Sequence, residues 1–319
     1  MKGGCALNPE KPIIPASTLP PLPDWRVWWR QMRPHTLTAS VIPVLIGTAM
    51  AMSHTAIHLP LFFAMLAASL LIQAATNLFN EYYDYKRGLD TPESVGIGGA
   101  IVRDGISPKT VLCLAILFFF IAILLGLYIC ANSSWWIAVV GLVSMAVGYF
   151  YTGGPYPLAY TPFGELASGF FMGPVIVLIS YYIQAGTLSR DVVLTSIPVA
   201  ILVGAILLSN NIRDLDSDRE RGRKTLAIRL GRPKAIQLLA GMFAAAYLWT
   251  IVYALIIASY WFLLVLLSLP KAVQAIRRFR GKTKPAEMMP AMKSTAQLHT
   301  QYGILLMAGI LLEGFIIIN

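Results

Sequence analysis

The sequence predicts an all-α membrane protein folded as a bundle of nine transmembrane helices. Three observations support this prediction: an apolar composition, repeated apolar runs, and positive charge confined to one side. The 319 residues are 57% hydrophobic and only 13% charged, and their mean hydropathy is +0.66. A soluble protein needs more polar side chains than this to cover its surface, so we expect the chain to lie in a lipid bilayer.

Apolar runs of about 20 residues are long enough to cross a hydrocarbon layer about 30 Å thick as helices. In chain order we expect helices at residues 36–56, 60–85, 109–131, 134–152, 162–184, 190–212, 234–257, 259–279 and 295–318. Residues 36–319 would then form one polytopic domain. Residues 1–35 would form a Pro-rich cytosolic lead, and the tryptophans near its end, beside Arg26 and Arg30, predict a short interfacial helix.

Positive charge gives the orientation of these helices. With the N-terminus inside, all 25 Lys and Arg residues except Arg190 fall in the N-terminal segment and the even-numbered loops. Since Lys and Arg are retained on the cytosolic side, this predicts a multi-pass protein of the cell (inner) membrane with a cytosolic N-terminus. The net charge of +10 is then a topology signal, and we expect no nucleic-acid partner.

Acidic residues gather at the cytosolic ends of the second and sixth expected helices, in two copies of one pattern. Asn77-x-x-Asn80-x-x-x-Asp84-x-x-Arg87-Gly88-x-x-Thr91 runs parallel to Asn211-x-x-Asp214-x-x-x-Asp218-x-x-Arg221-Gly222-x-x-Thr225. The residue types match at every position except one, where Asn80 stands opposite Asp214. Because the copies lie four helices apart, the bundle is predicted to consist of two related four-helix units plus a ninth helix.

The spacing of the acids indicates a cation site. Residues four apart project from one face of a helix, so each copy offers a pair of oxygen-bearing side chains. Gly88 lets the chain leave the helix, so that Asp90 can return toward the same pocket. Mg²⁺ prefers oxygen ligands and is commonly held by one or two carboxylates plus substrate phosphates. We therefore expect Mg²⁺ to be bound by Asn80, Asp84, Asp90, Asp214 and Asp218, with Asn80, Asp84, Asp214 and Asp218 as the catalytic group.

Basic, amide and aromatic residues near both motifs would complete a substrate site. Phosphate oxygens can accept hydrogen bonds from Asn77, Arg87, Arg103, Asn211, Arg213, Arg221 and Lys224. The aromatic residues near the motifs are Phe79, Tyr82, Tyr149 and Tyr151, and the alternative to a role in the site is core packing. For Glu93, Asp216 and Glu220, which lie off the paired faces, the alternative is an ordinary solvated helix end. Glu165 follows a helix start, where the helix dipole favours a carboxylate.

These motifs resemble the UbiA superfamily of intramembrane prenyltransferases from about Arg33 onward. The resemblance lies in Asn80-Glu81-x-x-Asp84-x-x-x-Gly88-x-Asp90 and in Asp214-x-x-x-Asp218. Members that act on 4-hydroxybenzoate would need an acid where this chain has Gly88. The spacing found here, with Tyr151-Thr-Gly-Gly-Pro155 and Thr161-Pro-Phe-Gly-Glu165, is similar to the group that prenylates 1,4-dihydroxy-2-naphthoate. Some relatives carry a Lys just before the tyrosine that matches Tyr160, whereas this chain has Ala159; a phosphate contact there must come from elsewhere, for example Arg103, or be absent.

The resemblance implies an Mg²⁺-dependent transfer of a polyprenyl chain from polyprenyl diphosphate to 1,4-dihydroxy-2-naphthoate. Diphosphate and carbon dioxide would be released and demethylmenaquinone formed, with Tyr160 in the acceptor or prenyl pocket. The resemblance also implies an allylic cation, which the rings of Phe79, Tyr82, Tyr149 or Tyr151 could stabilise. One alternative is another acceptor, 4-hydroxybenzoate or homogentisate. A more distant alternative is a transporter of anions or metal complexes, but transport sites usually lie near the midplane on broken helices, whereas both acidic motifs are expected at helix ends.

Overall fold

The computed structural model describes residues 25–90 and 99–318, and every regular element within these ranges is helical. In chain order the helices are α1 (Trp25–Gln31), α2 (Pro34–Met52), α3 (Leu59–Lys86), α4 (Pro108–Asn132), α5 (Trp136–Thr152), α6 (Gly164–Phe170), α7 (Ile176–Ala185), α8 (Arg190–Arg213), α9 (Leu215–Glu220), α10 (Leu226–Leu230), α11 (Arg232–Ile256), α12 (Leu269–Phe279) and α13 (Pro285–Ile318). Short helical segments also occur at Leu158–Tyr160, Phe171–Val175 and Tyr260–Ser268.

Each of the predicted apolar ranges coincides with a helix or with consecutive helical segments. Among the described residues, five helices are long and apolar enough to cross a membrane by themselves: α3, α4, the continuous run Gly164–Ala185, α8 and α11. The bent pair of α1 and α2 would make a sixth span. The all-helical bundle is therefore confirmed, while the count of nine transmembrane helices stays a prediction. The boundaries of the lead and its membrane-surface position stay predictions too, although a short helix does begin at Trp25.

Local chemistry explains where the helices begin and bend. Ser189 caps α8 by accepting a hydrogen bond from the amide of Val192 at 3.3 Å. Between α6 and α7, Pro174 interrupts the backbone hydrogen bonds, and the chain passes through a π-helical turn. Gly173 in this turn permits close packing, because a Cβ there would stand 2.6 Å from the Cα of Ala200 on α8. The turn is thus fixed against the helix that carries the second acidic motif.

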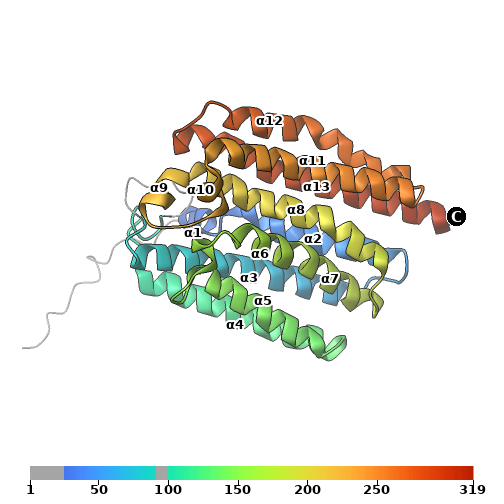
Figure 1. Cartoon of the computed structure of the whole chain (residues 1–319). Helices are drawn as coiled ribbons and strands as arrows, with labels where there is room; N and C mark the ends of the chain where they lie inside the picture. The colour runs from blue at the N-terminus through green and yellow to red at the C-terminus, as the bar shows by residue number, and fades with distance from the viewer. Residues whose placement is uncertain (1–24, 91–98, 319) are drawn as a thin grey trace, which may run out of the picture.

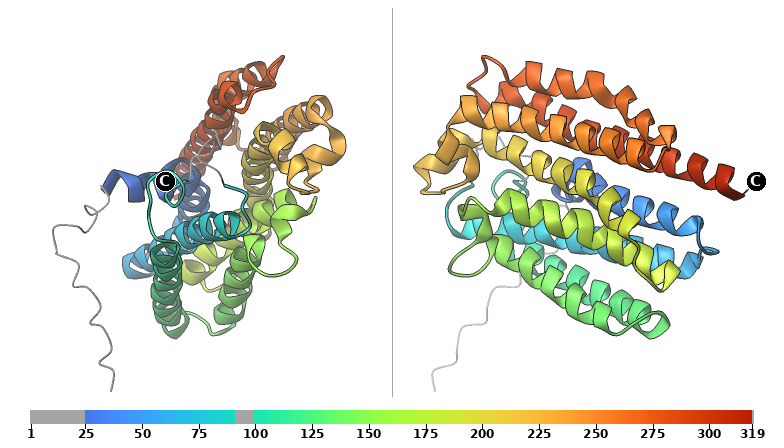
Figure 2. Two further views of the ribbon diagram at one scale, coloured as in Figure 1. Left: turned by 90° about the vertical axis from the view of Figure 1, so that its left-hand side faces the viewer. Right: turned by 45° about the vertical axis from the view of Figure 1, so that its right-hand side comes forward.

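The helices lie side by side along a common direction, with α4 and α5 at one edge and α12 at the other (Figure 1). Helix α3 packs on α4, α8 on α11, and α2 on both α7 and α13. The largest apolar core lies among α2, α8, α11 and α13. A smaller core joins α3, α4, α5 and α7, and the two further views in Figure 2 show these helices on the same side of the bundle.

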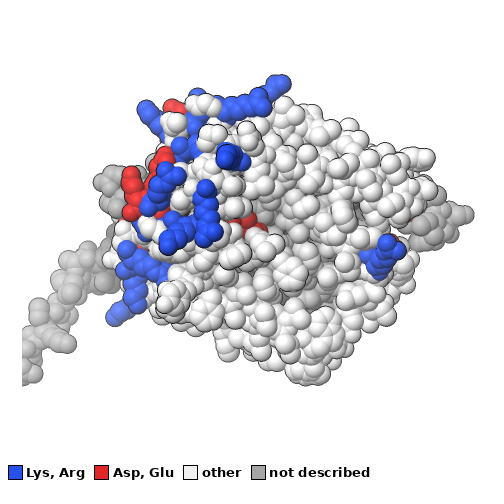
Figure 3. Space-filling view, viewed as in Figure 1, with Lys and Arg blue, Asp and Glu red and all other residues white. Residues whose placement is uncertain are grey.

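One end of the bundle, here called the basic end, carries α9, α10 and the C-termini of α3 and α8. Figure 3 shows most of the Lys and Arg side chains visible in this view at this end, together with acidic side chains. Both acidic motifs therefore lie at the same end of the bundle, as the sequence predicts. Thr91 of the first motif, and Glu93 beyond it, lie outside the described residues.

Candidate active site

An elongated cavity leads from the basic end into the bundle. It encloses about 410 Å³ and is lined by α2 to α8. Polar side chains line it where α3 and α8 end: Asn77, Asn80 and Asn210, together with Arg33. Farther along, the lining is apolar and includes Met65, Ala68, Ala122, Ile129, Ile137 and Ile179. The cavity therefore combines a polar mouth with a long apolar interior.

The first acidic motif folds back on itself as the sequence predicts. Gly88 adopts φ +69°, a conformation that glycine reaches without strain, and the amide of Leu89 donates to the carbonyl oxygen of Asp84 at 2.8 Å. This turn returns Asp90 to the end of α3. Burial, together with the nearby charges of Asp84 and Glu81, raises the pKa of Asp90 to about 6. Asp84 and Asp90 thus belong to one site.

The second motif differs from the expected continuous helix. Helix α8 ends at Arg213, and Asp214, with φ −91° and ψ 5°, joins it to the separate helix α9 that carries Asp218. The carboxylate of Asp214 accepts two hydrogen bonds from its neighbour Arg213, at 2.7 and 2.5 Å. Arg213 also contacts the sulfur atoms of Met289 and Met292 on α13. The carboxylate of Asp214 is therefore held by Arg213, while the amide of Asp218 donates to the carbonyl oxygen of Asp214 at 2.9 Å, one helical turn away. The pairing of these two side chains at a metal stays a prediction.

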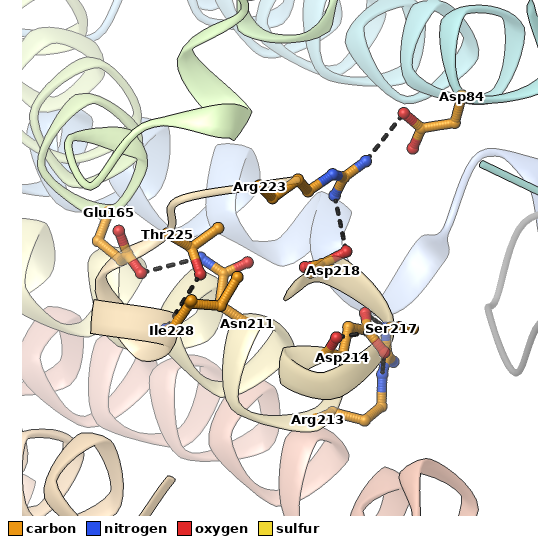
Figure 4. Close-up of polar contacts among 10 residues, drawn as sticks. All are labelled: Asp84, Glu165, Asn211, Arg213, Asp214, Ser217, Asp218, Arg223, Thr225 and Ile228. Atoms are coloured by element: carbon orange, nitrogen blue, oxygen red, sulfur yellow. Dashed lines mark hydrogen bonds and ion pairs between the residues drawn. The ribbon is translucent and has the colours of Figure 1, made fainter. Parts of the chain in front are cut away.

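Arg223 joins the two motifs across the site, as Figure 4 shows. Its Nη2 donates to Oδ1 of Asp84 at 2.9 Å, and its Nη1 lies 3.3 Å from Oδ1 of Asp218. Burial raises the pKa of Asp218 to about 6, although the charge of Arg223 opposes this rise. One buried guanidinium thus stands between two largely buried carboxylates that come from opposite halves of the bundle.

The oxygen atoms at the site fit a metal that arrives with a phosphate ligand. In the part of the chain that the structure describes, no group of three or more His, Cys, Asp or Glu side chains could hold a metal ion alone. Yet Oδ1 of Asn80 is buried without a hydrogen-bond partner, beside the carboxylates at the end of α3. Mg²⁺ typically takes one or two carboxylates and completes its shell with water and substrate phosphates. The residues present therefore suit an Mg²⁺–diphosphate complex better than a free ion.

Four of the seven residues expected at the diphosphate hold the protein together instead of standing free. Asn77 donates to the carbonyl oxygen of Met32 at 3.0 Å. Asn211 donates to Oε1 of Glu165 at 2.8 Å. Arg213 binds Asp214 and the methionines, as described above. Arg87 donates to the carbonyl oxygens of Thr152 and Gly154. These contacts tie the cavity walls and the loop 153–160 in place.

The other three expected diphosphate residues lie in loops at the basic end. Arg221 is close enough to Asp90 and Asp218 for its charge to oppose the rise in the pKa of both carboxyl groups. Arg103 packs against Gly99, in a loop whose amides at Gly99 and Ile101 donate to the carboxylate of Glu81. The backbone amide of Lys224 donates to the carbonyl oxygen of Tyr160 at 2.9 Å.

The aromatic candidates divide between the core and the cavity. Phe79 and Tyr149 pack edge to face at 5.3 Å, and the hydroxyl groups of Tyr83 and Tyr149 are 2.6 Å apart. Tyr82 stacks edge to face on Tyr83. Of the five aromatic residues expected at the pocket (Phe79, Tyr82, Tyr149, Tyr151 and Tyr160), Tyr151 is the one that lines the cavity. The ring of Tyr160 lies between two guanidinium groups, with its centroid 5.5 Å from Cζ of Arg87 and 5.2 Å from Cζ of Arg223.

Sequence reasoning missed several polar residues at the site. Arg223 occupies an unmatched position of the second motif, between Gly222 and Thr225, and the first motif has Leu89 there, so the alignment of the two motifs did not select it. Asn210 precedes the motif and lines the cavity mouth. Glu165 lies in the first turn of α6, as expected, but it is also buried, with one carboxylate oxygen bound by Asn211 and the other without a partner. Because Asn211 lies on α8, its hydrogen bond to Glu165 holds α8 against α6. The two residues are far apart in the chain, so no local sequence pattern predicts this contact.

Comparison with known proteins agrees with this arrangement. The sequence profile of the UbiA prenyltransferase family matches residues 40–295, well over half of the chain. The chain belongs to the UbiA prenyltransferase family. A 1,4-dihydroxy-2-naphthoate octaprenyltransferase of Bacillus subtilis is 59% identical over 293 residues, which cover 91% of this chain and 94% of that protein. A protein of the same name from Mycobacterium tuberculosis is 32% identical over 269 residues, covering 84% of this chain and 91% of that protein.

Solved structures of UbiA homologues share the fold. The apo structure of a homologue from Aeropyrum pernix K1 aligns with a TM-score of 0.65 at 18% identity, covering 88% of this chain and 98% of that chain. A homologue from Archaeoglobus fulgidus, bound to DMAPP and Mg²⁺, aligns with a TM-score of 0.62 at 14% identity, covering 88% and 98% respectively. At these identities the likeness establishes the helical architecture alone.

Proposed function

We propose that this UbiA-family enzyme transfers a polyprenyl group from polyprenyl diphosphate to 1,4-dihydroxy-2-naphthoate, releasing diphosphate and carbon dioxide and forming demethylmenaquinone in its reduced, hydroquinone form. The observation that carries the proposal is the cavity of about 410 Å³, apolar along its length and polar at its mouth, beside the two acidic motifs. A polyprenyl diphosphate has the same division between an apolar tail and an anionic head. The acceptor is supported by the names of the relatives at 59% and 32% identity.

The diphosphate would lie at the basic end between α3 and α9. Asp84, Asp90 and Asp218, with the unpaired oxygen of Asn80, are the groups that would hold Mg²⁺ there; Asp214 could join them on release from Arg213. Bound Mg²⁺ would neutralise the diphosphate and make it a better leaving group. Arg221, beside Asp90 and Asp218, would donate hydrogen bonds to phosphate oxygens.

The cavity supplies the conditions for the transfer itself. Its apolar lining excludes water from the allylic carbon, which would otherwise react with water as the C–O bond breaks and the bonding pair leaves with diphosphate. The ring of Tyr151 on the cavity wall would stabilise the positive charge that develops. The electron-rich naphthol ring then forms the new C–C bond at the carbon that bears its carboxylate. Loss of that carboxylate as carbon dioxide restores the aromatic ring.

The protein would lie in the cell membrane with its basic end in the cytosol. Several apolar helices, and the gathering of most of the Lys and Arg side chains visible in Figure 3 at one end, support this orientation, because Lys and Arg are retained on the cytosolic side. Water-soluble diphosphate would then leave directly into the cytosol, while the prenylated product would remain in the bilayer.

The test is a direct competition between acceptors. Purified enzyme in lipid nanodiscs receives Mg²⁺, a polyprenyl diphosphate and an equimolar mixture of 1,4-dihydroxy-2-naphthoate, 4-hydroxybenzoate and homogentisate, and the products are identified by mass spectrometry. We expect prenylated, decarboxylated naphthol as the main product. A preference for either benzenoid acid would overturn the acceptor assignment, and the absence of any prenylated product would overturn the proposed reaction.

A further inference from the structure

We propose that Arg223 is a diphosphate-binding residue which, before substrate binds, serves as an internal cation that occupies the carboxylates of the metal site. This inference rests on the proposed function and deepens it, because it assigns a role to a residue that is not among the repeated positions of the two motifs. In the substrate-free enzyme Arg223 would hold Asp84 and Asp218 together. On binding of Mg²⁺ and diphosphate it would release them and bind phosphate oxygens.

The first argument is the position of the guanidinium. Its side chain is only 14% exposed, and it bridges Asp84 on α3 and Asp218 on α9 at 2.9 and 3.3 Å. The carboxylates belong to the two copies of the acidic motif, so this one side chain links both halves of the proposed metal site. Two buried carboxylates facing each other without a cation would repel, and the arginine offsets that repulsion.

The second argument is that the partners of Arg223 are the groups that Mg²⁺ would need. A carboxylate oxygen that binds Mg²⁺ is a much poorer acceptor for a guanidinium, so the two cations compete for Asp84 and Asp218. The guanidinium cannot lose its charge, and it therefore needs another anion when the carboxylates are taken. Diphosphate is the anion that would arrive with the metal, and its oxygens match the fork of N–H donors. The Nε atom of Arg223, buried without a partner, is an additional donor for it.

The third argument is that the partners of Arg223 are groups that substrate and metal can replace, whereas those of its neighbour Arg87 are backbone carbonyl oxygens. It lies in the loop between α9 and α10, next to Gly222 at φ +77°, and its guanidinium rests on the ring of Tyr160 at 5.2 Å. Arg87, which contacts the same ring, is bound to the carbonyl oxygens of Thr152 and Gly154 and is therefore fixed. Of the two cations against Tyr160, Arg223 is the one whose present partners are exchangeable. Arg223 also places a positive charge at the ring of Tyr160. The residue before that tyrosine is the buried, uncharged Ala159, where some relatives carry a Lys.

The test compares Arg223→Gln and Arg223→Lys with Arg219→Gln, which removes the same charge from an exposed site on α9. Calorimetry on detergent-purified protein measures binding of Mg²⁺ alone, and then of inorganic diphosphate in saturating Mg²⁺. For Arg223→Gln we expect the two affinities to change in opposite directions. Mg²⁺ alone should bind more tightly, because no internal cation competes. Diphosphate should bind about tenfold to a hundredfold more weakly, as for loss of one or two charged hydrogen bonds.

Arg223→Lys should restore part of the diphosphate affinity, and Arg219→Gln should leave both affinities unchanged. Wild-type diphosphate affinity in Arg223→Gln would overturn the inference. So would a parallel loss of both affinities accompanied by a lower melting temperature, because that result marks a purely structural role. Turnover of the wild-type enzyme with 1,4-dihydroxy-2-naphthoate is measured separately. If that turnover is absent while the opposite changes in affinity are present, the proposed acceptor fails and the role of Arg223 stands.

Discussion

The substitution Asp218→Asn tests whether the buried carboxylate of α9 acts on a cation. The side chain of Asp218 is 5% exposed, and asparagine keeps its shape while removing its charge. Removal of one preorganised group that stabilises charge in the transition state costs about 2.7–4 kcal/mol. At about 1.4 kcal/mol per factor of ten, kcat/KM should fall by about two to three orders of magnitude.

Stability should respond differently from activity. Burial raises the pKa of Asp218 to about 6, above its ordinary value, so the folded state disfavours the ionised form of this carboxyl group. At pH 7.5 the neutral asparagine removes that cost, and we expect a melting temperature equal to or above that of the wild type. Thermal unfolding and steady-state prenylation are therefore measured on the same preparations.

Asp216→Asn provides a matched control on the same helix. Asp216 is 57% exposed and pairs with Arg232 at the surface, and such pairs contribute about 0–1 kcal/mol. Its kcat/KM should stay within about fivefold of the wild type. Near wild-type activity in Asp218→Asn would refute the reasoning, as would an equal loss in both variants.

Three further predictions concern metal, chain length and orientation. Excess chelator should stop turnover, and added Mg²⁺ should restore it; full activity in chelator would contradict the role of the metal. The Mg²⁺ concentration required for turnover should rise below about pH 6, where protonation of Asp90 and Asp218 competes with metal binding. Ala122→Phe, on the cavity wall, should shift the preference of the enzyme to diphosphates with shorter prenyl chains. Each five-carbon unit that no longer fits the apolar cavity loses about 4 kcal/mol of binding free energy. The control Leu124→Phe, on the exposed face of α4, should leave the preferred chain length unchanged. In a chain without its native cysteines, Thr187→Cys should react with an impermeant reagent applied to intact cells and Glu220→Cys should not, and the reverse pattern would invert the topology.

Periodicity and charge could predict the helical ranges, because each depends on a local run of residues. They could not predict where α13 begins. The apolar run starts near residue 295, but the helix starts at Pro285, since Met288 and Ala291 are buried and Met292 contacts Arg213. That packing joins segments far apart in the chain. For the same reason the segment Tyr260–Ser268, expected to be part of a regular span, is a 3₁₀ helix packed on α13.

In the candidate site, too, features set by local sequence could be predicted, whereas features that depend on distant residues could not. The convergence of Asp84 and Asp90 follows from a helix end and a glycine turn, both of which are local, and the sequence predicted it. The break between α8 and α9 at Asp214, and the contact of that carboxylate with Arg213, were not predicted. Arg213 is itself held by methionines of α13, far away in the chain. Arg223 was missed because its importance comes from carboxylates on two different helices, a relation that spacing within one segment does not contain.

Release of the acceptor's carboxylate is the most direct test of the proposed reaction. The measurement uses 1,4-dihydroxy-2-naphthoate labelled in its carboxyl carbon, with Mg²⁺ and a polyprenyl diphosphate, and follows label in trapped carbon dioxide and in the prenylated product. One equivalent of labelled carbon dioxide should appear per equivalent of product, and none should appear with Asp218→Asn beyond its residual turnover. Label retained in the prenylated product would show that prenylation occurs at another ring carbon and would contradict the proposed reaction.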